Sequence, residues 1–259
     1  MNLDPWLAAL DERHLANLTP AEVTRALRAL SSCYVERREK LATGGALDGA
    51  GKRAAFALFY GPQHFFITRE VVRAIRAGAG RPAAAAPDAA LYQRVIDLGC
   101  GTGTAGAATA IEAGGAAIQG FDLNPWAVSE ANWTYRALGL RGRATIANIT
   151  KMKVPASAGT LVLAAYTVNE LPGRGRQPLL DQLKAAHAAG AAVLVIEPIG
   201  RRVNLWWDEW AEAFVAAGGR HDDWRFQVAL PPRQRALAKA AGLDVQALTA
   251  RSLYMSPPT

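Results

Sequence analysis

The amino-acid sequence predicts an α/β protein, with a doubly wound parallel sheet that follows a helical N-terminal cap. From residue 93 onward, short β-rich runs alternate with helical segments, which is typical of a sheet covered by helices on both faces. The first run, Val95-Ile96-Asp97-Leu98, leads directly into a glycine-rich turn at 99–103. Such a turn lets a ligand approach the main chain closely.

Helical spacing dominates the first third of the chain. Thr19-Pro20-Ala21-Glu22 predicts a helix start, with Thr19 as the N-cap, Pro20 at the first position and Glu22 three residues after the cap. A second helix is expected over 50–60, ended by Gly61-Pro62, and a third over about 64–77.

A low-complexity stretch at 78–90, rich in alanine, glycine and proline, predicts a hinge. We therefore expect a helical cap over 1–90 and a ligand-binding domain over 91–259, with an aromatic helical insertion at about 200–230.

The expected elements of the second domain follow in order. Strands are predicted at 94–98, 116–121, 144–147, 160–165, 191–197, 243–248 and 251–255, and helices at 104–113, 125–138, 177–189 and 231–241.

Composition excludes several classes of protein. A hydrophobic content of 51% with 20% charged residues is globular and excludes wholesale disorder. Two cysteines, Cys33 and Cys100, exclude a disulfide framework and a four-cysteine metal site within the chain, and no metal is expected. The net charge of +7 is spread along the chain, so it permits an anionic partner without identifying one.

The N-terminal segment carries Asp4, Asp11 and Glu12 and has no basic region before an apolar run. We therefore expect no secretory leader. Apolar runs stay shorter than the roughly 18 residues of a membrane span. The expectation is a cytoplasmic protein that makes no use of a membrane.

Asp97 helps to identify the ligand of the glycine-rich turn. Gly101, Gly103 and Gly106 fit the dinucleotide spacing, and Asp122 stands where a ribose-binding acid is expected, so NAD is one candidate. A carboxylate at the strand tip would repel a pyrophosphate, whereas it suits the ammonium and sulfonium groups of S-adenosylmethionine. Charge therefore favours S-adenosylmethionine.

The motif D-L-G-C-G-T-G, followed by G-F-D-L-N-P, resembles those of the class I S-adenosylmethionine-dependent methyltransferases, over residues 93–255. The resemblance implies a Rossmann-like, seven-stranded sheet and an enzyme that uses this cofactor. It also implies that Asp97 and the backbone of the turn hold the methionine end, that Asp122 binds the ribose, and that Leu123 flanks the adenine. Asn148, beside Ile149, replaces the acid that usually faces the adenine. The residues of the turn are Gly99, Cys100, Gly101 and Gly103.

The end of the fourth predicted strand is expected to lie near the transferable methyl group. Tyr166, Asn169 and Glu170 are the candidate catalytic residues there, and Tyr166 also borders the cofactor. Glu170 is either a general base or the cap of the next turn. Candidate substrate-binding residues lie at the same rim and in the cap: Tyr60, His64, Glu197, Arg201 and Trp206.

A narrower resemblance involves A-Y-T-V-N-E-L, then V-L-V-I-E-P-I-G, then Asp223-Trp224-Arg225-Phe226. In this order they resemble a methyltransferase-like family that associates with the small ribosomal subunit. Mitochondrial members hold an iron–sulfur cluster, but Arg225 replaces a cysteine here and no cysteine follows Cys100, so no cluster is expected.

Three functions stay open at this stage. The first is methylation of small-subunit ribosomal RNA, and the second is methylation of a small molecule. The third is a cofactor-binding ribosome-assembly factor without transferase activity. An apolar, uncharged pocket would favour the small molecule, and an arginine-lined crevice would favour RNA.

Overall fold

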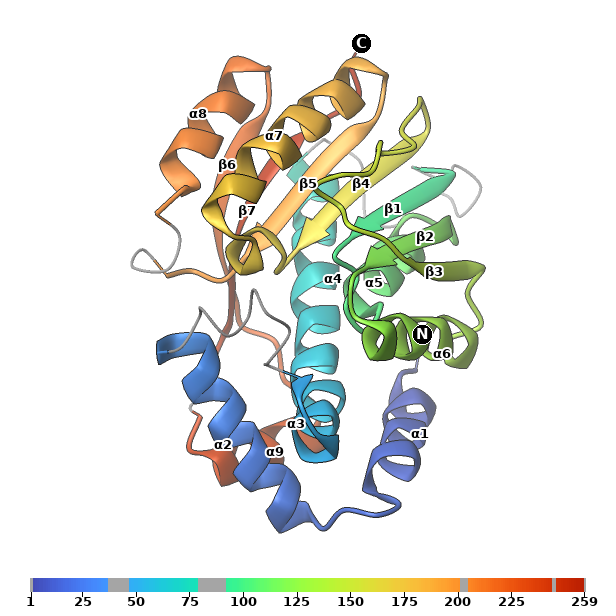
Figure 1. Cartoon of the computed structure of the whole chain (residues 1–259), viewed down its shortest axis with the longest axis vertical. Coiled ribbons are helices and arrows are strands. Elements are labelled where there is room, and N and C mark those ends of the chain that lie inside the picture. The colour runs from blue at the N-terminus through green and yellow to red at the C-terminus, as the bar shows by residue number, and fades with distance from the viewer. Residues whose placement is uncertain (1, 37–46, 79–91, 201–204, 244–245, 259) are drawn as a thin grey trace.

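The computed structural model describes residues 2–36, 47–78, 92–200, 205–243 and 246–258, and it contains a seven-stranded sheet with helices on both faces (Figure 1). The strand order is β3-β2-β1-β4-β5-β7-β6. β1 to β5 pair in parallel, and β7 runs antiparallel to β5 and β6. The strands are β1 (Arg94–Leu98), β2 (Ala117–Asp122), β3 (Gly142–Ile146), β4 (Thr160–Ala165), β5 (Ala192–Glu197), β6 (Arg220–Phe226) and β7 (Leu248–Met255).

This sheet confirms the predicted doubly wound fold. The strand order reverses between β1 and β4, and in such sheets the ligand crevice lies at that reversal, beyond the carboxyl ends of the strands. The helices are α1 (Asp4–Leu15), α2 (Pro20–Glu36), α3 (Ala50–Ala55), α4 (Gly61–Gly78), α5 (Thr104–Glu112), α6 (Pro125–Ala137), α7 (Gly173–Ala188), α8 (Trp207–Ala216) and α9 (Pro232–Ala241), with a π-turn η3 (Phe56–Tyr60) and a 3₁₀ turn η4 (Val168–Glu170).

Side chains alternate between two apolar cores because successive strand residues point to opposite faces. Val95 packs with α4, α5 and the cap, whereas Ile96 packs with α7 and α8. Both residues are fully buried, as expected for central parallel strands.

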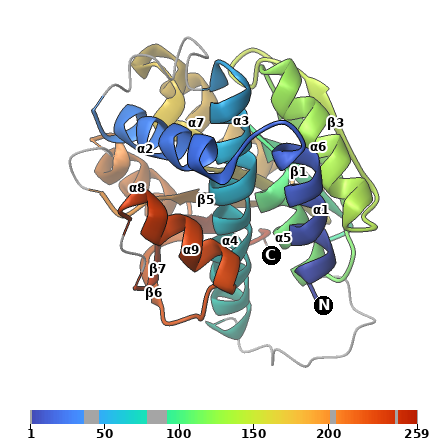
Figure 2. The same ribbon diagram turned by 90° about the horizontal axis from the view of Figure 1, so that it is seen from below.

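The N-terminal helices cover the carboxyl end of the sheet (Figure 1). α9, although it lies near the C-terminus of the chain, packs against α2 and η3. It therefore lies with the N-terminal helices at the carboxyl end of the sheet, as Figure 2 shows from below. The predicted start of α2 is confirmed, because Glu22 accepts the Thr19 N–H at 2.7 Å and Thr19 Oγ1 accepts the Glu22 N–H at 3.3 Å.

Gly61-Pro62 does not end the second helix as predicted. α3 continues through the π-turn η3 directly into α4. A proline inside a helix leaves one carbonyl without its usual donor. In η3 that carbonyl, on Leu58, accepts hydrogen bonds from Arg233 and Gln234 of α9. The chain therefore passes the proline without breaking the helix.

The predicted closing strands also need correction. The aromatic helix expected within 200–230 is present as α8, but residues 220–226 of that insertion form β6. Residue 243 and residues 246 and 247 are not in a strand, and β7 is continuous from Leu248 to Met255. β6 was missed because its burial alternates at a half-exposed edge among charged residues. Residues 244 and 245, and the predicted hinge beyond Gly78, lie outside the described residues.

Within the described ranges, the helices are too short or too polar to cross a membrane.

Candidate functional site

The glycine-rich turn after β1 adopts a conformation that only glycine takes without strain. Gly99, Gly101 and Gly103 have φ values of 71°, 52° and 76°. A Cβ on Gly103 would lie 2.8 Å from the Tyr135 ring and 2.9 Å from Ala131 of α6. Gly103 therefore shapes the turn and lets α5 pack close to α6, and it does not itself line the cavity described next.

A cavity of about 230 Å³ lies over this turn, at the reversal between β1 and β4. Its floor comes from the ends of β1, β2, β3 and β4, and its roof from Leu47, Phe56 and His64 of the cap. Predicted site residues that line it are Gly99, Cys100, Gly101, Asp122, Leu123, Asn148, Ile149, Tyr166, Glu170 and His64. The structure thus brings candidate cofactor-binding residues and candidate catalytic and substrate-binding residues to the same cavity.

Asp97 lies beneath the turn rather than at the cavity. It is 1% exposed, and its Oδ2 accepts the Gly106 N–H at 3.1 Å. Burial raises the pKa of this carboxyl to about 7. Asp97 therefore supports the start of α5, and its predicted contact with the methionine end would need to be indirect.

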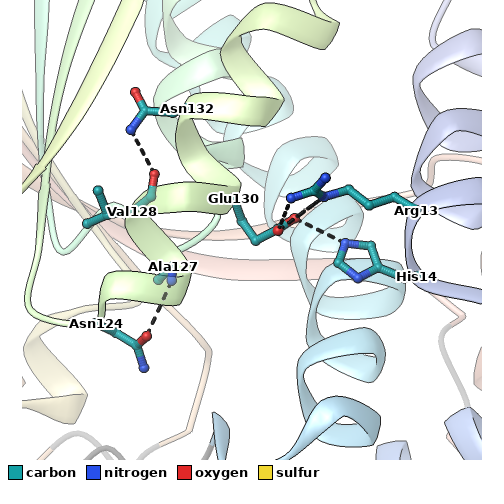
Figure 3. Close-up of polar contacts among 7 residues, drawn as sticks. All are labelled: Arg13, His14, Asn124, Ala127, Val128, Glu130 and Asn132. Atoms are coloured by element: carbon teal, nitrogen blue, oxygen red, sulfur yellow. Dashed lines mark hydrogen bonds and ion pairs between the residues drawn. The ribbon is translucent and has the colours of Figure 1, made fainter. Parts of the chain in front are cut away.

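Asp122 ends β2 with its carboxylate at the cavity. Oδ2 accepts the Gly101 N–H at 2.9 Å and Oδ1 accepts the Asn124 N–H at 2.8 Å. Burial raises the pKa of Asp122. Asn124 in turn caps α6 by accepting the N–H groups of Trp126 and Ala127. Figure 3 shows the bond from Ala127. The carboxylate is therefore held between the turn and the start of α6, next to Leu123, which is 62% exposed.

Asn148 lines the cavity with its oxygen already engaged. Oδ1 accepts the Thr150 N–H at 3.0 Å and the Thr150 hydroxyl at 2.8 Å. The group that Asn148 presents to an adenine is then its Nδ2, a hydrogen-bond donor. This differs from the expected acceptor role, and it suits a ring nitrogen of adenine rather than its amino group.

Tyr166 and His64 form a stacked pair on the opposite side of the cavity. Their ring centroids lie 3.7 Å apart, with planes 8° from parallel. Tyr166 has a φ of 58°, a strained backbone for a non-glycine residue. Burial lowers the pKa of His64 to about 3 and raises that of the Tyr166 hydroxyl. Both rings are therefore neutral at physiological pH.

Glu197 and Trp206, predicted to bind the substrate, and Asn169, a candidate catalytic residue, do not line the cavity. Glu197 is fully buried, and it accepts the Asn169 N–H at 3.2 Å and the Asn169 Nδ2 at 2.8 Å. Burial raises the pKa of Glu197 to about 8. Trp206, also buried, donates from Nε1 to Asn169 Oδ1 at 2.9 Å. These residues hold the turn between Tyr166 and Glu170 from behind, while Glu170 itself is exposed and lines the cavity.

Two predicted substrate-binding residues, Tyr60 and Arg201, remain. Tyr60 packs against Phe56, Phe59 and His64 behind the roof, without lining the cavity. Arg201 lies outside the described residues. Sequence reasoning missed Phe56 and Leu47, although the aromatic spacing Phe56, Tyr60, His64 was a visible signal.

The charges at the cavity fit S-adenosylmethionine better than a dinucleotide. Asp122 and Glu170 are carboxylates, and the described lining contains no arginine or lysine. An anionic pyrophosphate would meet only like charge there, whereas a sulfonium would be attracted. In the described residues no cluster of three or more histidine, cysteine, aspartate or glutamate side chains could hold a metal ion.

Comparison with known proteins gives a family match over part of the chain. Residues 95–190 match the family model described as a methyltransferase domain, which spans the glycine-rich turn, Asp122 and the Tyr166–Glu170 segment. Among proteins with curated descriptions, none matches the sequence significantly.

Several solved structures are similar at low identity. A TehB-like SAM-dependent methyltransferase from Corynebacterium glutamicum is 17% identical, with 76% of this chain and 100% of that chain covered and a TM-score of 0.44. A SAM-dependent methyltransferase from Aquifex aeolicus is 17% identical over 62% of this chain and 80% of that chain, with a TM-score of 0.43. The O-methyltransferase NcsB1 from neocarzinostatin biosynthesis, in complex with SAM and a naphthoic acid, is 18% identical over 67% of this chain and 51% of that chain, with a TM-score of 0.46. At these scores the fold assignment rests on the strand order.

Proposed function

We propose that this chain, a class I S-adenosylmethionine-dependent methyltransferase, transfers the methyl group to RNA, with small-subunit ribosomal RNA as the acceptor. The observation that supports an RNA acceptor is the position of the cations. The described cavity lining is not the arginine-lined crevice expected for RNA, since it contains no arginine or lysine. Several cations nevertheless lie within a few residues of the lining along the chain. They are Lys52, Arg53, Lys151, Lys153, Arg174 and Arg176.

The first turn of α7 is the sharpest case. Its N-cap is Pro172, a lining residue, and it has neither a capping side chain nor an acidic residue. Arg174, exposed, and Arg176 lie in that turn, where the helix dipole already favours anions. Arginine side chains at this positive end of the helix dipole destabilise the helix slightly unless an anion is bound there. A phosphate group of the acceptor would supply that anion.

A cavity without cations in its described lining, with basic residues close to it in the sequence, suits a nucleotide. Phosphates stay on the surface and are bound there by basic side chains, while an unstacked base, which is uncharged, enters the cavity. The narrower sequence resemblance supports the small ribosomal subunit as the source of this RNA. The proposal also places the protein in the cytoplasm, because ribosomal RNA is found there.

The bound cofactor supplies an electrophilic methyl group on a sulfonium that is already a good leaving group. The chain must then position the acceptor, which supplies most of the rate in such reactions. We assign Asp122 to the ribose, and the neutral rings of His64 and Tyr166 to the acceptor side. Glu170, at the cavity, orients the acceptor nucleophile or removes its proton.

A small-molecule acceptor is the second candidate, because the described lining is cation-free and its cap residues Leu47 and Phe56 are apolar. The two candidates differ in what they require from Arg174. An RNA acceptor needs cations outside the cavity, whereas a small molecule enclosed within it does not.

The test is transfer of a radiolabelled methyl group to cell extract, separated into ribosomal, other RNA and small-molecule fractions. We expect label in small-subunit RNA, lost with Asp122→Ala. Arg174→Glu should weaken labelling about tenfold at physiological salt, while Lys184→Glu, an exposed position farther along α7, should not. Label confined to small molecules contradicts the proposal. Binding to small subunits without label would indicate the non-catalytic assembly factor.

A further inference from the structure

The carbonyl of Leu58 lacks the donor that a regular α-helix would give it. In an α-helix it would accept the N–H of residue 62, and Pro62 has no N–H. Two side chains of α9 donate to it, Arg233 Nη1 at 3.1 Å and Gln234 Nε2 at 2.9 Å. Residues some 175 positions away in the sequence thus stabilise the π-turn η3.

Burying the Gln234 side chain costs free energy of folding, and Arg233 is held in place by a second partner. Gln234 is 1% exposed, and its Oε1 is buried without a hydrogen-bond partner among the described residues. Arg233 also pairs with Asp11 of α1, at 2.7 Å from Nε to Oδ2. A buried amide oxygen without a hydrogen-bond partner costs free energy of folding. The hydrogen bond from Nε2 to the Leu58 carbonyl offsets part of that cost.

The π-turn changes which side chains meet. The ring centroids of Phe56 and His64 lie 6.0 Å apart, at 83° to each other. In the π-turn the Gly61 N–H bonds to the Phe56 carbonyl, five residues back, so the turn holds one more residue than an α-helical turn. The extra residue rotates the side chains that follow about the helix axis, and both rings line the cavity.

His64 then completes a wall with the catalytic side of the sheet. Its ring stacks on Tyr166, which follows β4, while Phe56 meets it edge-on. The three rings form a continuous aromatic wall, contributed by η3, α4 and the end of β4. Its position depends on how η3 is held.

We infer that Arg233 and Gln234 are positioning residues for the methyl acceptor, because they fix the π-turn that places Phe56 and His64 against Tyr166. The inference rests on the proposed function only in treating this wall as the acceptor side of the cavity. α9 contributes no residue to the described cavity lining, so both residues act indirectly, through their hydrogen bonds to the Leu58 carbonyl and, for Arg233, also through its ion pair with Asp11.

The first test uses Gln234→Met, which keeps the length of the side chain and removes the donor. The matched control is Lys239→Gln, an exposed residue on the same helix. We expect faster hydrogen–deuterium exchange in residues 56–64 for Gln234→Met alone. For whichever fraction the wild-type enzyme labels, kcat/KM for that acceptor should fall about tenfold, while KM for S-adenosylmethionine changes by less than about twofold. Arg233→Lys should keep most activity and Arg233→Met should not.

The outcomes separate this inference from the proposed function. Label on small molecules would overturn the RNA assignment, and the same kinetic comparison would then be made with that acceptor. If no acceptor is labelled, exchange in residues 56–64 decides. Unchanged exchange and kinetics in Gln234→Met, or equal losses for acceptor and cofactor, would overturn the inference.

A second variant tests the contact itself. Pro62→Ala restores a backbone N–H that can bond the Leu58 carbonyl. The effect of Gln234→Met on exchange in residues 56–64 should therefore shrink in the Pro62→Ala background. Equal effects in the two backgrounds would mean that Gln234 acts elsewhere.

Discussion

At the scale of single residues, the unusual feature is that two carboxyls are buried without a cationic partner in direct contact among the residues that the structure describes. Asp97 and Glu197 are bound by N–H groups, from Gly106 and from Asn169. Such bonds favour the charged form, yet burial raises the pKa of each, to about 7 and about 8. Both hold loops that shape the cavity, so their charge state is linked to the stability of the site.

Asp97→Asn should make stability less dependent on pH. A carboxyl whose pKa is higher in the folded state binds its proton more tightly there, so stability is greatest below the unfolded pKa and is lost as pH rises towards 7. Between pH 5 and 8 this loss is about 2 to 3 kcal/mol for Asp97. Urea unfolding without cofactor at several pH values measures it. The control Asp181→Asn, an exposed site, should match the wild type.

Glu170→Gln separates the two roles proposed for that residue. Glu170 is the exposed last residue of η4, and it lines the cavity. If it accepts the acceptor proton, kcat should fall about 100-fold while cofactor affinity, measured by calorimetry, stays unchanged. If it only caps the turn, kcat stays near the wild-type value and the melting temperature falls instead.

At the scale of elements, α1 joins the cap to α6, the helix that begins beside the cavity. Arg13 and His14 of α1 reach Glu130 of α6, at 2.7 Å and 3.1 Å (Figure 3). Burial would raise the pKa of Glu130, but hydrogen bonds from His14 and Arg13 outweigh it and hold that pKa below its usual value. α6 begins just after Asp122, so this contact ties the cap to the end of the sheet where we propose that the ribose binds.

Glu130→Ala should release α1 from α6. Glu130 is 3% exposed, and removing it leaves Arg13 and His14 facing each other without their anion. Because Arg13 is partly exposed, we expect a loss of about 2 kcal/mol, less than for a fully buried pair. Chemical unfolding and exchange in residues 4–15 measure it, with the exposed Glu212→Ala as control. A loss no greater than that of the control would show that α1 is held by its apolar face alone.

How far the sequence predicts an element depends on where its hydrogen bonds come from. The start of α2 was predicted correctly because Thr19 and Glu22 satisfy each other locally. Pro62 was misread because the donors for Leu58 come from α9, and no local pattern shows them. The glycine-rich turn and Asp122 were likewise readable from adjacent residues, whereas Phe56 and Leu47 reach the cavity only through tertiary packing.

At the scale of the whole molecule, the cavity joins parts that are distant in sequence. Its floor is built on the sheet and its roof comes from the cap, with α9 returning from beyond β6 to support that roof. A ligand that fills the cavity contacts both, so its binding should couple the cap to the sheet. Ligand binding should therefore raise the melting temperature of the whole chain, and the size of that shift can distinguish between candidate ligands.

S-adenosylmethionine, at about 100 times its dissociation constant, should stabilise the folded state by about 2.7 kcal/mol and raise the melting temperature by roughly 5–10 °C. NAD should give no shift, because its pyrophosphate would face Asp122 and Glu170 and the described lining offers no cation. Exchange should slow both in residues 56–64 and in residues 99–106, since the ligand lies between them. Asp122→Ala should abolish the shift. A shift with NAD but not with S-adenosylmethionine would contradict the cofactor assignment, and slower exchange in the sheet alone would show that the cap does not close over the ligand.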